Sequence, residues 1–279
     1  MKVSDIMTSP VHVMGPDEPV SHARNLMLRH KISTIVVVDR DEMVGIVTKS
    51  DLGRRLAQAE PMWRRRPIDK VPVKMIMTED PVTIYPEASI SQVTEVMIDN
   101  DINNVPVVNN GRLLGIVTRF DVVRRMSELP SDKKVGEIMT LDPVFVHRHH
   151  TVNHVVDEME SNKVSKLIVT DDTGEAVGII TTRELALHVL ANNEGELPSK
   201  SIKMARKPKS GGEKVYRYVK AVPLVAEDIM ANIAKILEVT DPITEAAKVM
   251  IDKNVTGIPI AENDEIVGIV SRTDVMKAA

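Results

Sequence analysis

The chain of 279 residues contains no cysteine. This absence excludes disulfides, zinc–thiolate centres and cysteine nucleophiles, and it fits a reducing cytoplasm. Aromatic residues make up only 2% of the chain, so the core must be built from aliphatic side chains and the 16 methionines. No apolar run approaches the roughly 18 residues of a membrane span, and the N-terminus lacks the apolar stretch of a signal peptide. We therefore expect a cytoplasmic protein with no membrane partner.

Motifs of catalysis are also missing. The sequence has no Walker A pattern, no Gly-x-Gly-x-x-Gly, no His-Glu-x-x-His and no nucleophile elbow. A net charge of −4 gives no global reason to expect nucleic acid or an anionic membrane as a partner. We expect that the protein is not an enzyme.

One motif is present four times. It consists of Gly, two aliphatic residues, a hydroxyl residue, two variable residues and an acid, and it runs over 45–51, 115–121, 178–184 and 268–274. Each copy lies downstream of an Ile-Met pair, at 6–7, 76–77, 138–139 and 229–230. Four motifs in a fixed register are an internal repeat.

Each copy predicts the order strand, helix, strand, strand, helix. In copy two this order comprises a strand at 81–85, a helix from Ile90, strands at 105–108 and 113–117, and a second helix from Thr118. Methionines recur at one position of the first helix, at Met27, Met97, Met159 and Met250. Methionines at helical spacing predict that this face of the helix lies in the hydrophobic core.

The repeats divide the chain into an α/β (α+β) array. We expect repeats at 1–58, 72–128, 133–190 and 224–279, with a basic insertion at 191–223. A unit of about 50 residues is too small to bury a good core alone. Copies one and two should therefore pair, as should copies three and four, with the connector 127–132 between the pairs.

Three segments carry a resemblance to a known family. Ile76-Met77-Thr78, Val105-Pro106-Val107-Val108 and Gly-Ile-Val-Thr-x-x-Asp resemble the cystathionine beta-synthase (CBS) domain. Two such domains form a Bateman module. Four in one chain resemble the gamma subunit of AMP-activated protein kinase and its stand-alone archaeal relatives. The resemblance implies a disk of two modules that bind AMP, ADP or ATP, or S-adenosylmethionine, in clefts between paired domains.

The hydroxyl and the acid of each motif can be interpreted in two ways, as a helix cap and as part of a ligand site. Ser or Thr followed three residues later by an acid is a capping box, and all four copies fit it. The resemblance adds that the Asp is the ribose ligand, while the hydroxyl and the helix N-terminus face phosphate. These pairs are Thr48 with Asp51, Thr118 with Asp121, and Ser271 with Asp274. Copy three has the longer Glu184, which predicts an empty or altered site.

The resemblance also implies a wall for the adenine base around the Pro of the second strand. Copy two supplies Asn104 and Pro106, and copy four supplies Gly257 and Pro259, where glycine lets a flat ring approach the backbone. Copies one and three lack this Pro, so copies two and four look most complete.

Basic residues directly follow the hydroxyl. Arg119 and Arg272, like Lys49, could reach phosphates or could be solvated charges in the first helical turn.

A histidine cluster opens copy three. It comprises His147, His149, His150 and His154. No carboxylate at matching helical spacing completes a metal site, so we expect no metal, and a phosphate-facing role for one or two of these imidazoles stays open.

The insertion is strongly basic. Eight Lys and Arg residues lie between Lys200 and Lys220, with Glu213 as the only acid. Tyr216 and Tyr218 alternate with charged residues, as in a half-exposed strand. The segment could be a solvated loop, or a flexible hairpin that docks on a partner, an acidic surface or nucleic acid.

Together these features favour a regulatory protein that senses adenine nucleotides for an unidentified protein target. The two modules could pack within one chain, or exposed module faces could form a homodimer. Two alternatives are a nucleic-acid-binding protein that uses the basic 200–220 segment and a sensor of S-adenosylmethionine.

Overall fold

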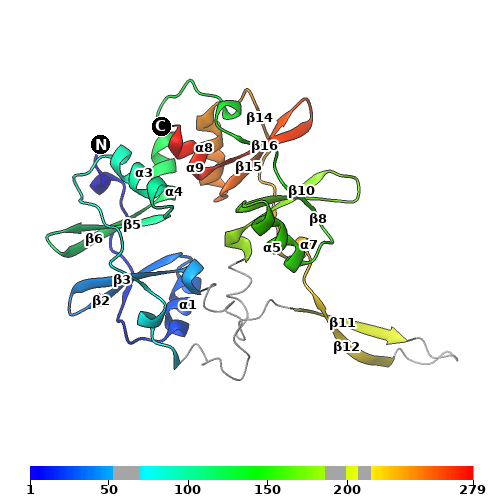
Figure 1. Cartoon of the computed structure of the whole chain (residues 1–279), viewed down its shortest axis with the longest axis horizontal. Coiled ribbons are helices and arrows are strands. Elements are labelled where there is room, and N and C mark those ends of the chain that lie inside the picture. The colour runs from blue at the N-terminus through cyan, green and yellow to red at the C-terminus, as the bar shows by residue number, and fades with distance from the viewer. Residues whose placement is uncertain (53–69, 186–198, 207–214, 279) are drawn as a thin grey trace. The chain divides into compact units, whose positions relative to one another are not determined.

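A computed structural model describes residues 1–52, 70–185, 199–206 and 215–278 (Figure 1), with the backbone alone over 199–206 and 215–221. The chain forms two compact units. One comprises Met1–Pro143 with Ile233–Ala279, and the other comprises Val144–Asn232. The first unit therefore contains copies one, two and nearly all of copy four.

Copies one and two occupy the first half of the chain. Copy one has η1 (Val3–Asp5), β1 (Val13–Met14), α1 (Val20–Arg29), β2 (Thr34–Asp39) and β3 (Glu42–Thr48), and residues 49–52 are helical. Copy two has η4 (Val73–Met75), β4 (Thr78–Glu79), α3 (Ile90–Asp99), β5 (Asn104–Asn109), β6 (Arg112–Thr118) and α4 (Arg119–Ser127). The strand predicted at 81–85 is reduced to one parallel bridge between Ile84 and Val107.

Copies three and four repeat this order. Copy three has η5 (Val135–Glu137), β7 (Thr140–Leu141), β8 (Phe145–His147), α5 (Val152–Ser161), β9 (Lys166–Thr170) and β10 (Ala176–Thr181). An antiparallel hairpin of β11 (Ser199–Arg206) and β12 (Val215–Pro223) follows. Copy four has α7 (Ala226–Ile229), β13 (Ala231–Asn232), β14 (Leu237–Glu238), α8 (Ile243–Asp252), β15 (Gly257–Glu262), β16 (Glu265–Ser271) and α9 (Arg272–Lys277). The mixed α and β repeat fold predicted from the sequence is confirmed.

The opening arm of each copy adds a strand to the copy paired with it. Strand β4 of copy two pairs with β3 of copy one, and Thr8 of copy one bridges to Ile116 in β6 of copy two. Likewise β7, at the start of copy three, pairs with β16 of copy four, and β13, at the start of copy four, pairs with β10 of copy three. Each pair of copies is thus joined by exchanged arms.

The exchanged arms explain two of the repeated sequence signals at once. A Cβ added at Gly45 would lie 2.7 Å from the Met77 sulfur and 2.9 Å from the Thr78 carbonyl oxygen. A Cβ at Gly115 would lie 2.6 Å from the Met7 sulfur. The Ile-Met pair and the motif glycine are therefore two halves of one contact, repeated in each copy.

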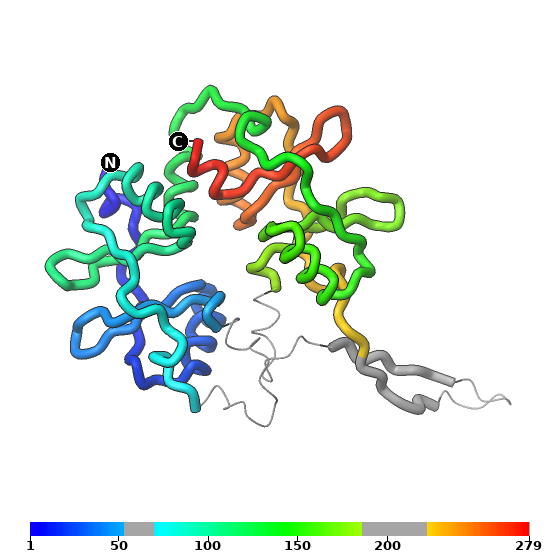
Figure 2. Tube along the Cα trace, viewed as in Figure 1, coloured from blue at the N-terminus to red at the C-terminus, as the bar shows by residue number. Residues whose placement is uncertain are grey.

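The predicted Met stripe is core. Met27, Met97, Met159 and Met250 are all buried. In the first unit one apolar cluster runs through copies two and four, where α4 packs against α8 and α9 (Figure 2). The connector 127–132 therefore does not separate the packing of copy two from that of copy four.

Candidate functional site

The hydroxyl and the acid of the repeated motif meet at the end of a strand in copy one. The backbone N–H and the hydroxyl of Thr48 both donate to Asp51 Oδ2, at 2.8 and 2.6 Å. The Asp51 backbone N–H in turn donates to the Thr48 hydroxyl at 3.3 Å. This is a reciprocal capping box at the start of the helix.

Copies two and four have the same arrangement, whereas in copy three the Thr181 hydroxyl accepts from the backbone N–H of Arg183 at 3.1 Å. The hydroxyls of Thr118 and Ser271 donate to the Oδ2 atoms of Asp121 and Asp274, at 2.7 and 2.6 Å. In copy three the longer Glu184 also accepts from the hydroxyl and the backbone N–H of Thr181. The capping function predicted for all four copies is confirmed.

The cap uses only one oxygen of each Asp. Within the parts of the chain that the structure describes, Asp51 Oδ1 and Asp274 Oδ1 have no hydrogen-bond partner. Asp121, which is only 4% exposed, accepts a contact from the Arg124 guanidinium at 3.3 Å on Oδ1. A carboxylate has about four lone-pair sites. Capping therefore leaves each Asp able to accept a ligand hydroxyl.

The strand register places each cap beside the predicted base wall. Asn104 pairs with Thr118, and Gly257 pairs with Ser271. Pro106 and Pro259 lie two residues further along the same strands, so they share a face with Asn104 and Gly257. Facing residues on neighbouring strands have Cβ atoms about 5 Å apart. The residues predicted for ribose and base thus come together in copies two and four.

Copy one has, at the position of the base wall, a residue that the predicted set of site residues does not include. Thr34 takes the position of Asn104 and Gly257, and it pairs directly with Thr48. Its side chain is 7% exposed, and its hydroxyl has no hydrogen-bond partner among the described residues. A hydroxyl in register with Asn104 was the signal available in the sequence. In copy three this position is Lys166, opposite Thr181.

The two arginines predicted to reach phosphate are held by the protein itself. Arg119 donates to the carbonyl oxygens of Ile102 and Met97 at 3.0 and 3.1 Å, and it forms an ion pair with Asp101 at 3.0 Å. Arg272 makes the corresponding hydrogen bonds in copy four. It donates to the carbonyl oxygens of Val255 and Met250 at 3.1 and 3.5 Å, and to Asn254 Oδ1 at 3.3 Å. These guanidinium groups bind the C-terminal ends of α3 and α8. Their contact with phosphate stays a prediction.

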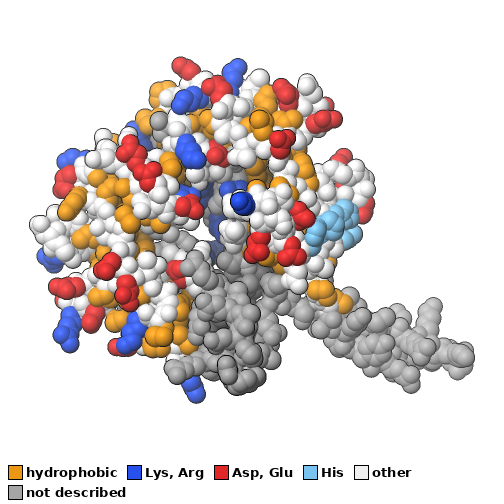
Figure 3. Space-filling model, viewed as in Figure 1, with side chains coloured by type: hydrophobic (Ala, Val, Ile, Leu, Met, Phe, Trp, Pro, Cys, Tyr) orange, Lys and Arg blue, Asp and Glu red, His pale blue; other side chains and the backbone are white. Residues whose placement is uncertain are grey.

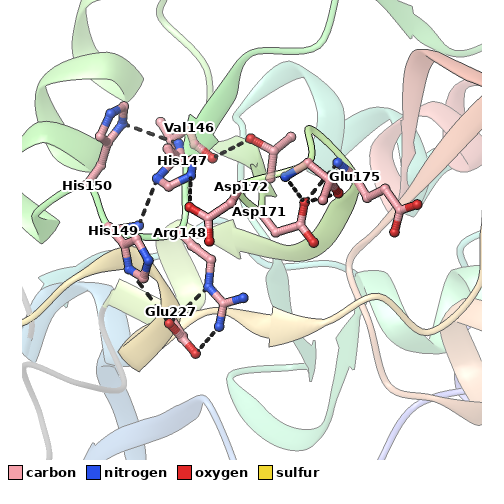
Figure 4. Close-up of polar contacts among 11 residues, drawn as sticks. Val146, His147, Arg148, His149, His150, Asp171, Asp172, Glu175 and Glu227 are labelled. Atoms are coloured by element: carbon pink, nitrogen blue, oxygen red, sulfur yellow. Dashed lines mark hydrogen bonds and ion pairs between the residues drawn. The ribbon is translucent and has the colours of Figure 1, made fainter.

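The histidine cluster forms a turn between β8 and α5 (Figure 4). The backbone N–H of His147 donates to His150 Nδ1 at 3.3 Å, and that of His149 donates to His147 Nδ1 at 3.4 Å. His147 Nε2 lies 3.2 Å from Asp172 Oδ1. Burial, together with the charges of His154 and His147, lowers the pKa of His150.

An ion pair ties this turn to the arm of copy four. Arg148 binds Glu227 of α7 through two contacts, and this hydrogen bonding lowers the pKa of the Glu227 carboxyl. The histidines form a patch on the surface, with carboxylates beside it (Figure 3). Among the described residues, no group of three or more His, Asp or Glu is placed to hold a metal ion.

No helix in the described ranges is both long and apolar enough to cross a membrane.

Comparison with known proteins extends the sequence resemblance. Protein MJ1404 of Methanocaldococcus jannaschii is 26% identical over 281 residues, which is 99% of this chain and 61% of that protein. The L-aspartate semialdehyde sulfurtransferase of the same organism is 32% identical over 132 residues, 47% of this chain and 25% of the enzyme. This chain therefore spans less than two thirds of the length of either relative.

Two crystal structures share the fold over 99% of both chains. Protein MJ1225 of Methanocaldococcus jannaschii, described as a candidate archaeal homologue of the AMP-activated protein kinase gamma subunit, superimposes with a TM-score of 0.75 at 20% identity. A conserved protein of Pyrococcus horikoshii gives a TM-score of 0.64 at 16% identity. The CBS domain profile matches residues 3–58, 73–128, 135–191 and 225–279. With four matched repeats, the arms exchanged between them and these structural relatives, the chain belongs to the CBS domain family.

Proposed function

We propose that this protein is a regulatory subunit-like sensor that binds adenine nucleotides at its CBS domains and is not itself an enzyme. CBS domain pairs are regulatory ligand-binding modules, and this chain is built almost entirely of them. AMP, ADP and ATP are the ligands that the family resemblance implies.

The observation that carries the proposal is the buried, unpaired hydroxyl of Thr34 beside the half-buried carboxylate of Asp51 in copy one. The buried Thr34 hydroxyl lies opposite Thr48, and Asp51 next to it keeps one carboxylate oxygen without a partner among the described residues. A buried polar group without a partner costs about 1–3 kcal/mol. A ligand that offers adjacent hydroxyls and polar ring atoms would satisfy both groups, and an adenosine offers these.

Copies one, two and four are the sites that we propose. Each has an Asp whose second oxygen is outside the cap, and each has a small or amide side chain opposite the hydroxyl. Copy three has Glu184 and Lys166 in these places. The side chain of Glu184 is one methylene longer than that of Asp, so its carboxylate cannot take the same position relative to the backbone. We propose that copy three does not bind nucleotide.

The mechanism would be differential affinity. The exchanged arms join each pair of copies, so a ligand that bridges the two copies of a pair would favour one arrangement of them. A protein target would read this arrangement. No ligand can shift such an equilibrium further than its preference for one state over the other.

The test is thermal unfolding of the full chain with AMP, ADP, ATP and S-adenosylmethionine. A ligand at 100 times its dissociation constant should add about 2.7 kcal/mol. Asp121→Ala and Asp274→Ala should each lose part of this gain. Glu184→Ala is the matched control, because it removes a cap of the same kind from the copy that we exclude.

The outcomes separate the candidate functions. The proposal is supported if a nucleotide raises the unfolding midpoint, if the Asp variants reduce this rise, and if Glu184→Ala does not. The nucleotide that does so is then the ligand. A shift with S-adenosylmethionine alone supports the sensor of that compound. If no compound raises the midpoint, the motif is a helix cap only and the proposal fails.

Nucleic-acid binding at the basic insertion is a second candidate. The backbone of β11 and β12 forms an antiparallel hairpin, and between Lys200 and Lys220 the sequence holds eight basic residues against one acid. A hairpin with this excess of basic residues would attract phosphates. Fluorescently labelled RNA should bind with an affinity that falls as salt rises, and replacement of 199–223 by a short Gly-Ser linker should abolish binding. Binding that persists after replacement would contradict this candidate.

A further inference from the structure

Arg119 and Arg272 stand at the same position of their motifs, directly after the capping hydroxyl. Both bind the C-terminal end of the first helix of their own copy, as described above. The Arg119 side chain is 12% exposed. Most of its N–H donors are already used within the fold, so each guanidinium group is held in a fixed place rather than extended into solvent.

Each arginine also contacts the motif of the other copy. Arg119 Nη1 donates to the Thr273 hydroxyl at 2.8 Å, and Thr273 is the residue before Asp274. In the opposite direction, Arg272 Cζ lies 5.0 Å from the centroid of the Phe120 ring, and Phe120 is the residue before Asp121. The two ligand motifs therefore touch through a pair of matching contacts.

The surroundings make these contacts stiff. Helices α4, α8 and α9 pack together, and Val122, Val123 and Val275 belong to one buried cluster. A hydrogen bond to a charged group contributes about 1.5–3 kcal/mol, and more is lost when a buried donor is left unpaired. A movement at one motif cannot be absorbed locally without breaking such contacts.

We propose that Arg119 and Thr273 couple the nucleotide sites of copies two and four, an inference that rests on the proposed function of these sites. The backbone N–H of Arg119 donates to Asn103 O at 3.0 Å, immediately before the base-wall residue Asn104. A ligand that shifts Thr118 or Asn104 thus shifts Arg119, and Arg119 transmits the shift through Thr273 to Asp274. Arg119 is a positioning residue in this scheme and not a phosphate ligand.

The residues that make this contact differ in the other two copies. Copy one carries Lys49 and Ser50 at the positions of Arg119 and Phe120, and Ser50 is exposed. Copy three carries Thr182 and Arg183 there. Neither copy has an arginine directly after the capping hydroxyl.

A binding cycle on the full-length protein tests the proposal, with AMP as the probe. In an Asp51→Ala background, AMP has the sites of copies two and four only. Calorimetric titration gives the two macroscopic dissociation constants, and adding Asp121→Ala or Asp274→Ala gives each site alone. We expect the product of the macroscopic constants to differ from the product of the single-site constants by about fivefold or more, the lower end of typical coupling factors.

Thr273→Val should bring this ratio to within about twofold of unity, because it removes the acceptor of Arg119 and keeps the side-chain volume. Ser50→Ala changes the equivalent position of copy one and should leave the ratio unchanged. AMP binding to both sites without coupling, or coupling that survives Thr273→Val, overturns the inference and leaves the proposed function intact.

A measurement on the ligand-free protein tests the coupling in the case that AMP binds to neither site. If AMP binds to neither site, the proposed nucleotide function of copies two and four is what fails. Amide hydrogen exchange then decides whether the two motifs are coupled mechanically. Thr273→Val should accelerate exchange over 118–121 of copy two relative to Ser50→Ala, and equal exchange in the two variants overturns the coupling.

Discussion

At the scale of single residues, two threonines are buried without a hydrogen-bond partner for the hydroxyl among the described residues. Thr34 lies beside the capping box of copy one, and Thr94 lies in α3 of copy two. Both are 7% exposed. The first has a proposed function that explains the open hydroxyl, whereas the second has none. The two threonines therefore allow a test of whether Thr34 belongs to a ligand site.

Thr34→Val should raise the stability of the ligand-free protein by about 1 kcal/mol, because it removes an unpaired buried group at nearly constant volume. It should also reduce the rise of the unfolding midpoint that AMP produces. Thr94→Val is the matched control, since it should stabilise the chain equally and leave the effect of AMP unchanged. Both are measured by thermal unfolding with and without AMP. Equal AMP effects in the two variants would remove Thr34 from the site.

The residue scale also shows where sequence reasoning reached its limit. The Thr-x-x-acid spacing predicted the caps, because a cap depends on residues within one turn of the chain. The environment of Arg119 could not be predicted in the same way. Its partners Met97 and Thr273 are distant in sequence. The sequence alone therefore could not distinguish a phosphate ligand from a solvated charge at this position.

At the scale of elements, the exchanged arm depends on the absence of one side chain. Gly115→Ala would place a Cβ 2.6 Å from the Met7 sulfur and 3.0 Å from the Thr8 carbonyl oxygen. The sulfur can move, but the backbone oxygen belongs to the arm that bridges to β6. We expect a loss of about 1–3 kcal/mol from overpacking, measured by chemical denaturation.

Two further variants test this explanation. Gly15→Ala is the control, because its added Cβ would meet Glu18 at an ordinary 3.5 Å and should cost little. Met7→Ala in the Gly115→Ala chain should recover only part of the loss, since the Thr8 oxygen stays in place. Full recovery would show that the backbone of the arm is not constrained.

The turn of copy three that holds the histidine cluster should respond to pH. Burial and the nearby imidazoles of His154 and His147 lower the pKa of His150 below its ordinary value of 6.5. The unfolded chain then binds more protons than the folded one just below pH 6.5, so folding stability falls as the pH falls through that range. His150 accepts a backbone hydrogen bond through Nδ1, which protonation would remove.

His150→Gln should flatten this part of the pH dependence, measured as the thermal midpoint between pH 7.5 and 5.5. His30→Gln is the comparison, because it removes an imidazole at the C-cap of α1, outside the turn of copy three. It should leave the loss of stability below pH 6.5 in place. An unchanged slope in His150→Gln would mean that other groups control the acid response.

At the scale of the whole molecule, the sequence predicted the four repeats, because their motif and the Ile-Met pair recur at fixed spacing, and the small size of one repeat predicted that copies one and two are joined. It did not predict that arms are exchanged, since Thr8 and Ile116 are far apart in sequence and their pairing leaves no local pattern. Nor did it predict that copy four packs with copy two. The polar connector 127–132 suggested a boundary, but the apolar faces of α4, α8 and α9 decide the packing.

This packing predicts how the chain behaves when it is divided at the connector. A fragment of residues 1–130 exposes the face of α4 that α8 and α9 cover, including the fully buried Val122 and Val123. Burial of each such side chain contributes about 1.5–3 kcal/mol, so the exposed face should drive association. We expect fragment 1–130 alone to self-associate or precipitate. Co-expressed with 131–279, it should form a one-to-one complex.

Light scattering coupled to size exclusion measures both states. As a control, a protease site placed in the connector of the intact chain should allow cleavage without dissociation, because the helices are already packed when the chain is cut. Two monodisperse monomeric fragments that do not bind each other would contradict the shared core of copies two and four. They would also remove the physical basis for coupling through Arg119 and Thr273, because that hydrogen bond crosses the same interface.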